Sequence, residues 1–403
     1  MKNKQIPYGK QYISKNDIKA ITETLRSDFL TQGPKIAEFE KAFAKYTGAK
    51  YAVAVSNGTA GLHLCALALK VQPGQKIITT PITFAASANC IKYCGGEVAF
   101  ADIDRETYLI DINVISKLLS AAPIGTYAGI IAVDMAGRAV NLELLKQLAN
   151  KYDLWIIEDA CHAPGGFFID SGGNKQLCGN GNFADVAIFS FHPVKHITTG
   201  EGGMITTNDE QLYQKLLQLR THGITRNSEL FLNDLNWASG NAENLSSAYP
   251  GWYMEMQELG YNYRLTDFQS ALGISQLERA DKGLKRRREI AQKYSKAFKN
   301  KKWLIGQSGY IEGHAYHLYI IEVEERLGLY NYLKSKNIFL QVHYIPTHLM
   351  PYYKSQGSKL GDYPKAETYY SRCLSLPMYP TLVKADQQYV IDMICSFYIA
   401  NIE

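Results

Sequence analysis

One lysine on a glycine-rich loop is the first side chain of this sequence that could do covalent chemistry. Lys195 lies in FHPVKHITTGEGG, between the apolar runs ADVAIFSF and GGMITT, and His192 and His196 flank it. Apolar neighbours would withdraw the amine from water and so lower its pKa, which is the condition that a Schiff-base lysine needs. For a lysine taken alone, an ordinary surface position is the simpler interpretation.

A carboxylate stands at the end of another apolar run. Asp159 closes LWIIED, and His162 follows three residues later. A carboxylate at a buried strand end needs a partner, because burying it unpaired is costly. The partner could be a helix N-terminus, a salt bridge or the protonated ring nitrogen of a bound ligand. His162 could contact the same ligand, or it could be an ordinary turn histidine.

A third feature is a possible anion site. SNGTAGLHL follows the strand-like run YAVAVS and opens a helical pattern, in which Gly58 allows close approach and Thr59 offers a hydroxyl. Free N–H groups at a helix start bind phosphate, although small residues at such a turn can also serve packing alone. Pyridoxal 5′-phosphate needs partners for its phosphate, its ring nitrogen and its aldehyde. The phosphate-binding turn matches the first, the aspartate at a strand end the second and the lysine at a strand end the third. The combination predicts this cofactor.

The elements that must position these residues alternate along the first half of the chain. Seven apolar runs predict strands, and helical patterns separate most of them. The predicted strands are residues 51–56, 76–81, 97–103, 128–135, 154–160, 184–191 and 202–208. This alternation predicts an α/β fold with a mostly parallel sheet covered on both faces. In such sheets ligands bind beyond the carboxyl ends of the strands.

The pattern changes after Asn208. Residues 227–257 are polar and aromatic without a period, and a long helical pattern runs from Leu265 to about Asn300. A strand (315–323), a helix (324–337), a strand (339–346) and a closing helix (385–400) are predicted next. We expect a large cofactor-binding domain over residues 1–260, with N-terminal helices and an inserted loop at about 226–258. Residues 261–403 are expected to form a long linking helix and a smaller C-terminal α+β domain.

Composition narrows the class of protein. The chain has 403 residues, 46% of them hydrophobic, and a net charge of +5. Its densest basic run, residues 282–296, is explained as a solvated helix face, so no nucleic-acid partner is expected. Without a signal-peptide core or a run of membrane-spanning length, and with seven scattered cysteines, we expect a cytoplasmic protein with no membrane partner. Cys90 and Cys94 would share a helix face but are too few to hold a metal, and no metal site is predicted.

Several longer stretches are distinctive when taken together. They include FLTQGPKIAEFE, VSNGTAGLHL, PITFAASAN, IEDACHAPGG, SFHPVKHITTGEGGM and GYNYRLTDFQSALGISQL. With them the whole chain resembles the DegT/DnrJ/EryC1/StrS family of nucleotide-sugar aminotransferases. The resemblance implies the fold type I architecture of pyridoxal-phosphate enzymes, with a mostly parallel seven-stranded sheet in the large domain.

The resemblance also implies a role for each matched residue. Lys195 matches the catalytic lysine that holds the cofactor, and Asp159 matches the catalytic aspartate that pairs with its ring nitrogen. The other implied cofactor contacts are Gly58, Thr59 and Ser190 at the phosphate, Phe84 stacked on the ring, and His162 near the phenolic oxygen. Asn262, in GYNYR, matches a residue that reaches the cofactor in the partner subunit's site. A homodimer with shared active sites is therefore implied.

The lysine loop is most similar to that of the family branch that acts in pseudaminic acid biosynthesis. That branch transfers an amino group from L-glutamate, which leaves as 2-oxoglutarate, to C4 of a UDP-4-keto amino-sugar. The implied sugar is UDP-2-acetamido-2,6-dideoxy-β-L-arabino-hex-4-ulose, and the product is UDP-4-amino-4,6-dideoxy-N-acetyl-β-L-altrosamine. The implied substrate-binding residues are Tyr8, Asp28, Phe29, Leu30, Thr31, Gly58, Ser190, Asn262, Gln341, Val342, His343 and Tyr344.

Several alternatives stay open from the sequence. The substrate could be a keto-sugar of the bacillosamine or legionaminic type, or a 3-keto sugar. A nicotinamide-dependent oxidoreductase would need a GxGxxG turn after the first strand, which VSNGTAGLH lacks. A non-catalytic regulator is a further class. The inserted segment is longer than the family pattern, and it could extend a dimer arm or cover the sugar site.

Overall fold

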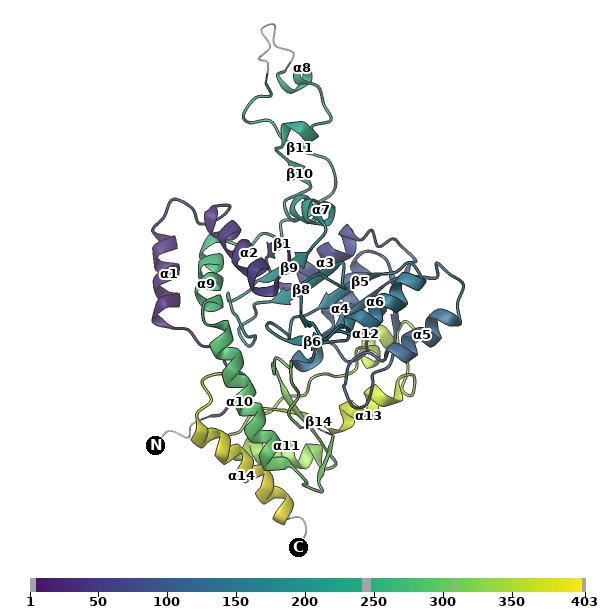
Figure 1. Ribbon diagram of the computed structural model, residues 1–403, viewed down its shortest axis with the longest axis vertical. Helices are drawn as coiled ribbons and strands as arrows, with labels where there is room; N and C mark the ends of the chain where they lie inside the picture. The colour runs from purple at the N-terminus through teal and green to yellow at the C-terminus, as the bar shows by residue number, and fades with distance from the viewer. Residues whose placement is uncertain (1–4, 241–247, 307–308, 401–403) are drawn as a thin grey trace.

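A seven-stranded sheet forms the centre of the computed structural model, which describes residues 5–240, 248–306 and 309–400 (Figure 1). The strand order is β1-β9-β8-β5-β4-β2-β3. The strands are β1 (Tyr51–Val55), β2 (Lys76–Thr79), β3 (Glu97–Phe100), β4 (Tyr127–Val133), β5 (Trp155–Asp159), β8 (Val186–Ser190) and β9 (Gly203–Thr207). Neighbours are parallel except at β9, which is antiparallel to β1 and β8. The predicted seven-stranded, mostly parallel sheet is confirmed.

Helices cover both faces of this sheet. Successive side chains of a strand point to opposite faces, so Ile130 and Ile156 pack with α5 and α6, whereas Ile131 and Ile157 pack with α3, α4 and α7. The covering helices are α2 (Pro34–Thr47), α3 (Gly58–Ala68), α4 (Ala86–Tyr93), α5 (Ile112–Ser120), α6 (Leu142–Lys151) and α7 (Glu210–Arg220). Burial on both faces explains why the strands are continuous apolar runs in the sequence.

A smaller antiparallel sheet belongs to the C-terminal part of the chain. It consists of β12 (Leu304–Gly306), β13 (Tyr319–Val323) and β14 (Cys373–Leu376). The helices of this part are α10 (Ala280–Phe298), α11 (Arg326–Ser335), α12 (Pro351–Lys354), α13 (Pro364–Arg372) and α14 (Lys384–Ala400). Ile6 pairs with Ile338 and lies in the core of this region. The boundary at residue 260 stays a prediction.

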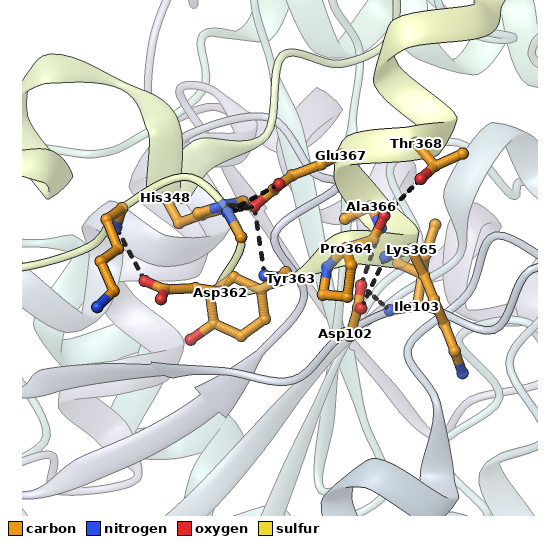
Figure 2. Close-up of polar contacts among 12 residues, drawn as sticks. Asp102, Ile103, His348, Asp362, Tyr363, Pro364, Lys365, Ala366, Glu367 and Thr368 are labelled. Carbon is orange, nitrogen blue, oxygen red and sulfur yellow. Dashed lines mark hydrogen bonds and ion pairs between the residues drawn. The ribbon is translucent and has the colours of Figure 1, made fainter.

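Asp102 joins the central sheet to the C-terminal part (Figure 2). It follows β3, and its carboxylate accepts the backbone N–H groups of Lys365 at 3.0 Å and Ala366 at 2.9 Å, at the start of α13. Beside it, His348 Nε2 lies 3.0 Å from Glu367 Oε1 on the same helix. A carboxylate at a helix N-terminus satisfies N–H groups that have no partner within the helix.

The structure corrects two predicted elements. The long linking helix expected from Leu265 to Asn300 is two helices, α9 (Asp267–Leu277) and α10. Arg279, between them, forms an ion pair with Asp17 of α1 (Lys15–Leu25). Residues 339–346 are not a strand, and of these Gln341 alone forms an isolated bridge, with Ser375 of β14. β14 pairs with β13 on one side, and Gln341 bridges to its other side.

An arm projects from the body of the molecule at the top of Figure 1. Its base is β10 (Ile224–Thr225) paired with β11 (Glu255–Met256), and it carries the 3₁₀ turn η2 (Ser228–Leu230) and the short helix α8 (Leu235–Ala238). The Glu255 carboxylate accepts the backbone N–H groups of Leu232 at 2.7 Å and Asn233 at 2.9 Å. Most of the predicted inserted loop is thus this arm, and residues 241–247 of it lie outside the described ranges.

Three short elements complete the described chain. They are the hairpin β6 (Phe167–Ile169) and β7 (Lys175–Leu177), and the 3₁₀ turns η1 (Met135–Gly137) and η3 (Thr347–Leu349). None of the helices in the described ranges has the combination of length and apolar character that spanning a bilayer requires.

Candidate active site

A cavity of about 750 Å³ lies beyond the carboxyl ends of β1, β5 and β8. This is the place where open α/β sheets bind ligands. Ten residues that the sequence singled out line it: Tyr8, Gly58, Thr59, Phe84, Asp159, His162, Ser190, Lys195, His343 and Tyr344. The three loops expected to carry the chemistry therefore meet in one site.

The start of α3 forms an anion seat at one side of the cavity. Asn57 caps the helix, and its side-chain oxygen accepts the N–H of Ala60 at 2.8 Å. Among the described residues no acceptor is found for the backbone N–H groups of Gly58 and Thr59. A Cβ atom on Gly58 would lie 3.2 Å from that of Ser190, so glycine lets α3 approach the end of β8. Two free donors at a helix N-terminus suit a phosphate.

Asp159 ends β5 and is only 6% exposed. Its Oδ2 atom accepts the hydroxyl of Ser87 at 2.6 Å, and its Oδ1 atom accepts the backbone N–H of Cys161 at 3.2 Å. A carboxylate has about four lone-pair sites, so two bonds leave it able to accept a further donor from the cavity. Ser87 was not predicted, although it lies three residues after Phe84 in the PITFAASAN stretch.

Lys195 is half-buried on the loop between β8 and β9. Its backbone N–H donates to the carbonyl of His192 at 2.9 Å, which makes the loop a tight turn. Removal from water lowers the pKa of its amine; Cys161 and Asp159 oppose this shift, and Arg287 adds to it. A lower pKa raises the fraction of neutral, nucleophilic amine.

Four histidines with lowered pKa values surround this amine. Burial is the main cause for each, and the positive charge of Lys195 lowers the pKa of each further, that of His343 to about 3. The others are His162, His196 and His317, and the rings of His162 and His317 are 4.4 Å apart between centroids. His317 follows no motif in the sequence, and only the packing of the C-terminal part against the sheet brings it here.

These groups fit the cofactor that the sequence predicts. The two free N–H groups of α3 suit its phosphate, the Asp159 carboxylate suits a protonated ring nitrogen, and the Lys195 amine suits its aldehyde. Phe84 is 63% exposed at the cavity, which leaves its ring free to stack on a planar ligand.

Other predicted site residues do not line this cavity. Asn262 forms a bridge with Thr221 at the base of the arm. Gln341 is exposed, and Val342 packs against the hydrophobic core. Residues 28–31 join α1 to α2, and the exposed Phe29 lines a separate cavity of about 630 Å³ together with Asp28. Within one chain these residues lie outside the cavity that Lys195 lines.

A buried acid pair lies beside Asp159. The side chains of Asp134 and Glu158 come within 4.8 Å of each other and of Cys178. Burial raises the pKa of both carboxyl groups, that of Asp134 to about 7. The charge of Asp134 raises the pKa of Glu158 further, whereas the hydrogen bond between the two side chains opposes the shift at Asp134, where the charge of Asp159 adds to it. The pair therefore retains a proton near neutral pH, and it adds less negative charge beside Asp159 than two ionised acids would.

Known proteins resemble this chain over almost its whole length. The sequence pattern of the DegT/DnrJ/EryC1/StrS aminotransferase family matches residues 11–395. The spore coat polysaccharide biosynthesis protein SpsC of Bacillus subtilis is 37% identical over 98% of this chain and 97% of its own. A UDP-4-amino-4,6-dideoxy-N-acetyl-β-L-altrosamine transaminase of Campylobacter jejuni is 34% identical over 97% of both chains.

Solved structures agree with the architecture. Helicobacter pylori PseC, an aminotransferase involved in the biosynthesis of pseudoaminic acid, superposes with a TM-score of 0.84 at 29% identity, over 98% of this chain and 100% of that one. The PLP form of the putative sugar aminotransferase Spr1654 from Streptococcus pneumoniae has a TM-score of 0.85 at 27% identity, over 98% of both chains. Both similarities extend over almost the whole of this chain.

Proposed function

We propose that this chain, which belongs to the DegT/DnrJ/EryC1/StrS aminotransferase family, aminates C4 of UDP-2-acetamido-2,6-dideoxy-β-L-arabino-hex-4-ulose. Its class follows from the family: it is a sugar aminotransferase that depends on pyridoxal phosphate. L-glutamate is the proposed donor and 2-oxoglutarate its product. The observation that carries the proposal is the meeting of Lys195 and Asp159 in one cavity, in a chain 34% identical to a transaminase named for this product.

The roles of the two side chains follow from their positions. The bound cofactor supplies an electron sink for charge that develops on the carbon bearing the amine. Asp159 is proposed to hold a proton on the ring nitrogen. The Lys195 amine, with its lowered pKa, is suited to take the proton from Cα of glutamate and to deliver one to C4 of the sugar in the second half-reaction.

The substrate is tested by offering the purified enzyme a set of nucleotide keto-sugars with L-glutamate. We expect 2-oxoglutarate to form fastest with the β-L-arabino-4-ulose. NMR of the product should show the C4 configuration of UDP-4-amino-4,6-dideoxy-N-acetyl-β-L-altrosamine. Keto-sugars of the bacillosamine type and 3-keto sugars are the alternative substrates whose rates are compared. The Lys195→Ala variant is the negative control. Preference for one of the alternatives would overturn the substrate but keep the reaction class.

A second substrate class has its own support. SpsC, named for spore coat polysaccharide biosynthesis, is 37% identical to this chain, compared with 34% for the altrosamine transaminase. A difference of this size does not separate two sugar specificities, so a keto-sugar precursor of a spore coat polysaccharide is a direct competitor as substrate. We also propose a cytoplasmic location, in keeping with seven cysteines that are all free thiols.

We further propose that two chains share each active site. Asn262 lies outside its own chain's cavity, and so do residues 28–31. Mixing inactive Lys195→Ala with inactive Asn262→Ala protein should restore about one quarter of wild-type activity, since random two-fold pairing leaves one site in four intact. Steady-state rates measured after verified subunit exchange check this expectation.

The matched control is a mixture of Lys195→Ala with Asp159→Ala. Both residues line the cavity of the same chain, so no pairing of these variants can rebuild a site. Recovery in this control, or no recovery with Asn262→Ala, would contradict a site to which Asn262 is supplied by the partner.

The arm is expected to strengthen the dimer. It starts beside Asn262, none of its described residues lines the cavity of its own chain, and Trp237 and Trp252 on it are 61% and 78% exposed. Burial of such side chains at an interface contributes about 1.5–3 kcal/mol each. We expect Trp237→Ser with Trp252→Ser to raise the monomer–dimer Kd by at least about tenfold.

Analytical ultracentrifugation measures this shift. Leu360→Ser is the control, because Leu360 is 73% exposed but lies far from the arm in sequence, between α12 and α13. An unchanged dimer together with a higher KM for the nucleotide sugar, but not for glutamate, would show instead that the arm covers the partner subunit's sugar site.

A further inference from the structure

His162 has both of its ring nitrogens engaged. Its Nδ1 atom lies 3.2 Å from the backbone nitrogen of Ala136, and its Nε2 atom lies 3.1 Å from the hydroxyl oxygen of Tyr344. The side chain is 5% exposed. A backbone N–H can only donate, so Nδ1 must be an acceptor, and an imidazole nitrogen that accepts carries no proton.

The backbone around Ala136 is built to present that N–H. Ala136 has φ of 61°, a conformation uncommon for a residue with a side chain, and Gly137 follows with φ of 100°. A Cβ atom on Gly137 would lie 2.7 Å from the carbonyl oxygen of His162, so glycine is needed for the turn to pack against the histidine. The Asp134 carboxylate closes the same turn by accepting the N–H of Val140 at 2.8 Å.

The charge state of His162 completes the argument. Burial lowers its pKa well below the usual range, and the neighbouring Lys195 lowers it further. A neutral imidazole carries one proton, and with Nδ1 accepting, that proton is on Nε2. The bond between His162 and Tyr344 therefore has one direction: Nε2–H donates and the phenol oxygen accepts.

The hydroxyl proton of Tyr344 is then left for the cavity. Burial raises the pKa of this phenol, and the charges of Asp159 and Cys161 raise it further, so the phenol stays protonated. Among the described residues no acceptor is found for its proton, and the side chain lines the cavity together with Lys195 and Asp159.

We propose that His162 is a positioning residue that fixes Tyr344 as a hydrogen-bond donor to an acceptor oxygen of a bound reactant. The chain of bonds runs one way, from Ala136 N–H to His162, from His162 to Tyr344, and from Tyr344 into the cavity. The site thus favours a carbonyl or phenolate oxygen over a group that can only donate. The identity of the bound reactant rests on the proposed function, whereas the direction of these hydrogen bonds does not.

The direction of these hydrogen bonds is tested on protein without substrate. In ¹⁵N-histidine-labelled enzyme, with His162 assigned by its loss in His162→Gln, long-range ¹H–¹⁵N spectra should show the Nε2–H tautomer from about pH 6 to pH 8. Tyr344→Phe should shift the Nε2 resonance and leave Nδ1 an acceptor. An Nδ1–H tautomer, or an imidazolium ion in this range, would overturn the proposal.

The kinetic consequence is tested in each half-reaction. Tyr344→Phe should slow amino transfer by about 10²-fold, the effect of removing one donor that meets developing charge. His162→Leu should slow it similarly, and the double variant should be no slower than Tyr344→Phe, because the two act as one unit. His162→Gln, whose amide can accept from Ala136 and donate to Tyr344, should recover most of the rate.

The two possible sources of the acceptor oxygen give different results. If it belongs to the cofactor, Tyr344→Phe changes the visible absorption and affinity of pyridoxal phosphate before any substrate is added. If it belongs to the sugar, only the sugar half-reaction slows. Wild-type rates in Tyr344→Phe, or strictly additive losses in the double variant, would overturn the proposal. If no keto-sugar is a substrate, the proposed function fails. The NMR result and the cofactor spectrum still test the direction of the hydrogen bonds from Ala136 to His162 and from His162 to Tyr344.

Discussion

Replacing Lys195 by alanine should lower the rate of amino transfer by at least about 10³-fold, within the range that general acid–base groups contribute. The amine is expected to hold the cofactor and to move the proton in both half-reactions. No other amine lines the described cavity, so none can take over. Single-turnover rates of the glutamate half-reaction measure the loss directly.

The same variant should fold as well as the wild type. Lys195 is only half-buried, and removal from water lowers its pKa, which means that the ammonium ion is less stable in the folded chain than in solvent. Truncation removes that unfavourable charge without opening a core cavity. We expect an unchanged or higher Tm. Lys195→Arg, which keeps the charge but cannot form a Schiff base, should be as inactive as alanine, and near wild-type turnover in either variant would refute the assignment.

Asp159→Asn should lower activity by at least about 10²-fold, which is the order of loss when a group that stabilises charge leaves an active site. The amide has nearly the same shape, and it can still bond to the hydroxyl of Ser87 and the N–H of Cys161. What it lacks is the negative charge that would keep a ring nitrogen protonated. Asp159→Ala should behave similarly, with weaker cofactor binding.

Ser87→Ala is the matched control for this prediction. It removes the 2.6 Å hydrogen bond to Asp159 but leaves the charge, so we expect a loss of about tenfold or less, the equivalent of one hydrogen bond. Stopped-flow absorbance of each half-reaction distinguishes the two variants. Normal turnover with tight cofactor binding in Asp159→Asn would mean that the carboxylate has a structural role only.

The sequence by itself determined the class of fold and the centre of the site. Strands buried on both faces must be apolar throughout, so they can be recognised in the sequence as continuous apolar runs such as 154–160 and 184–191. Lys195, Asp159 and Gly58 could be found for the same reason, because each stands at the end of such a run or within a few residues of it, and parallel strands bring their carboxyl ends to one edge. Local pattern and simple topology were sufficient there.

Only the tertiary structure decided the groups that reach the site from elsewhere. His317 lines the cavity through packing between segments far apart in the chain, for which no local pattern exists. The same holds for β14, which pairs with β13, and for the ion pair of Arg279, between α9 and α10, with Asp17 some 260 residues away. The direction of the bond from His162 to Tyr344 depends on a backbone N–H at Ala136, which no side-chain motif encodes. Such features arise from long-range contacts, whose register is set by packing rather than by local residue type.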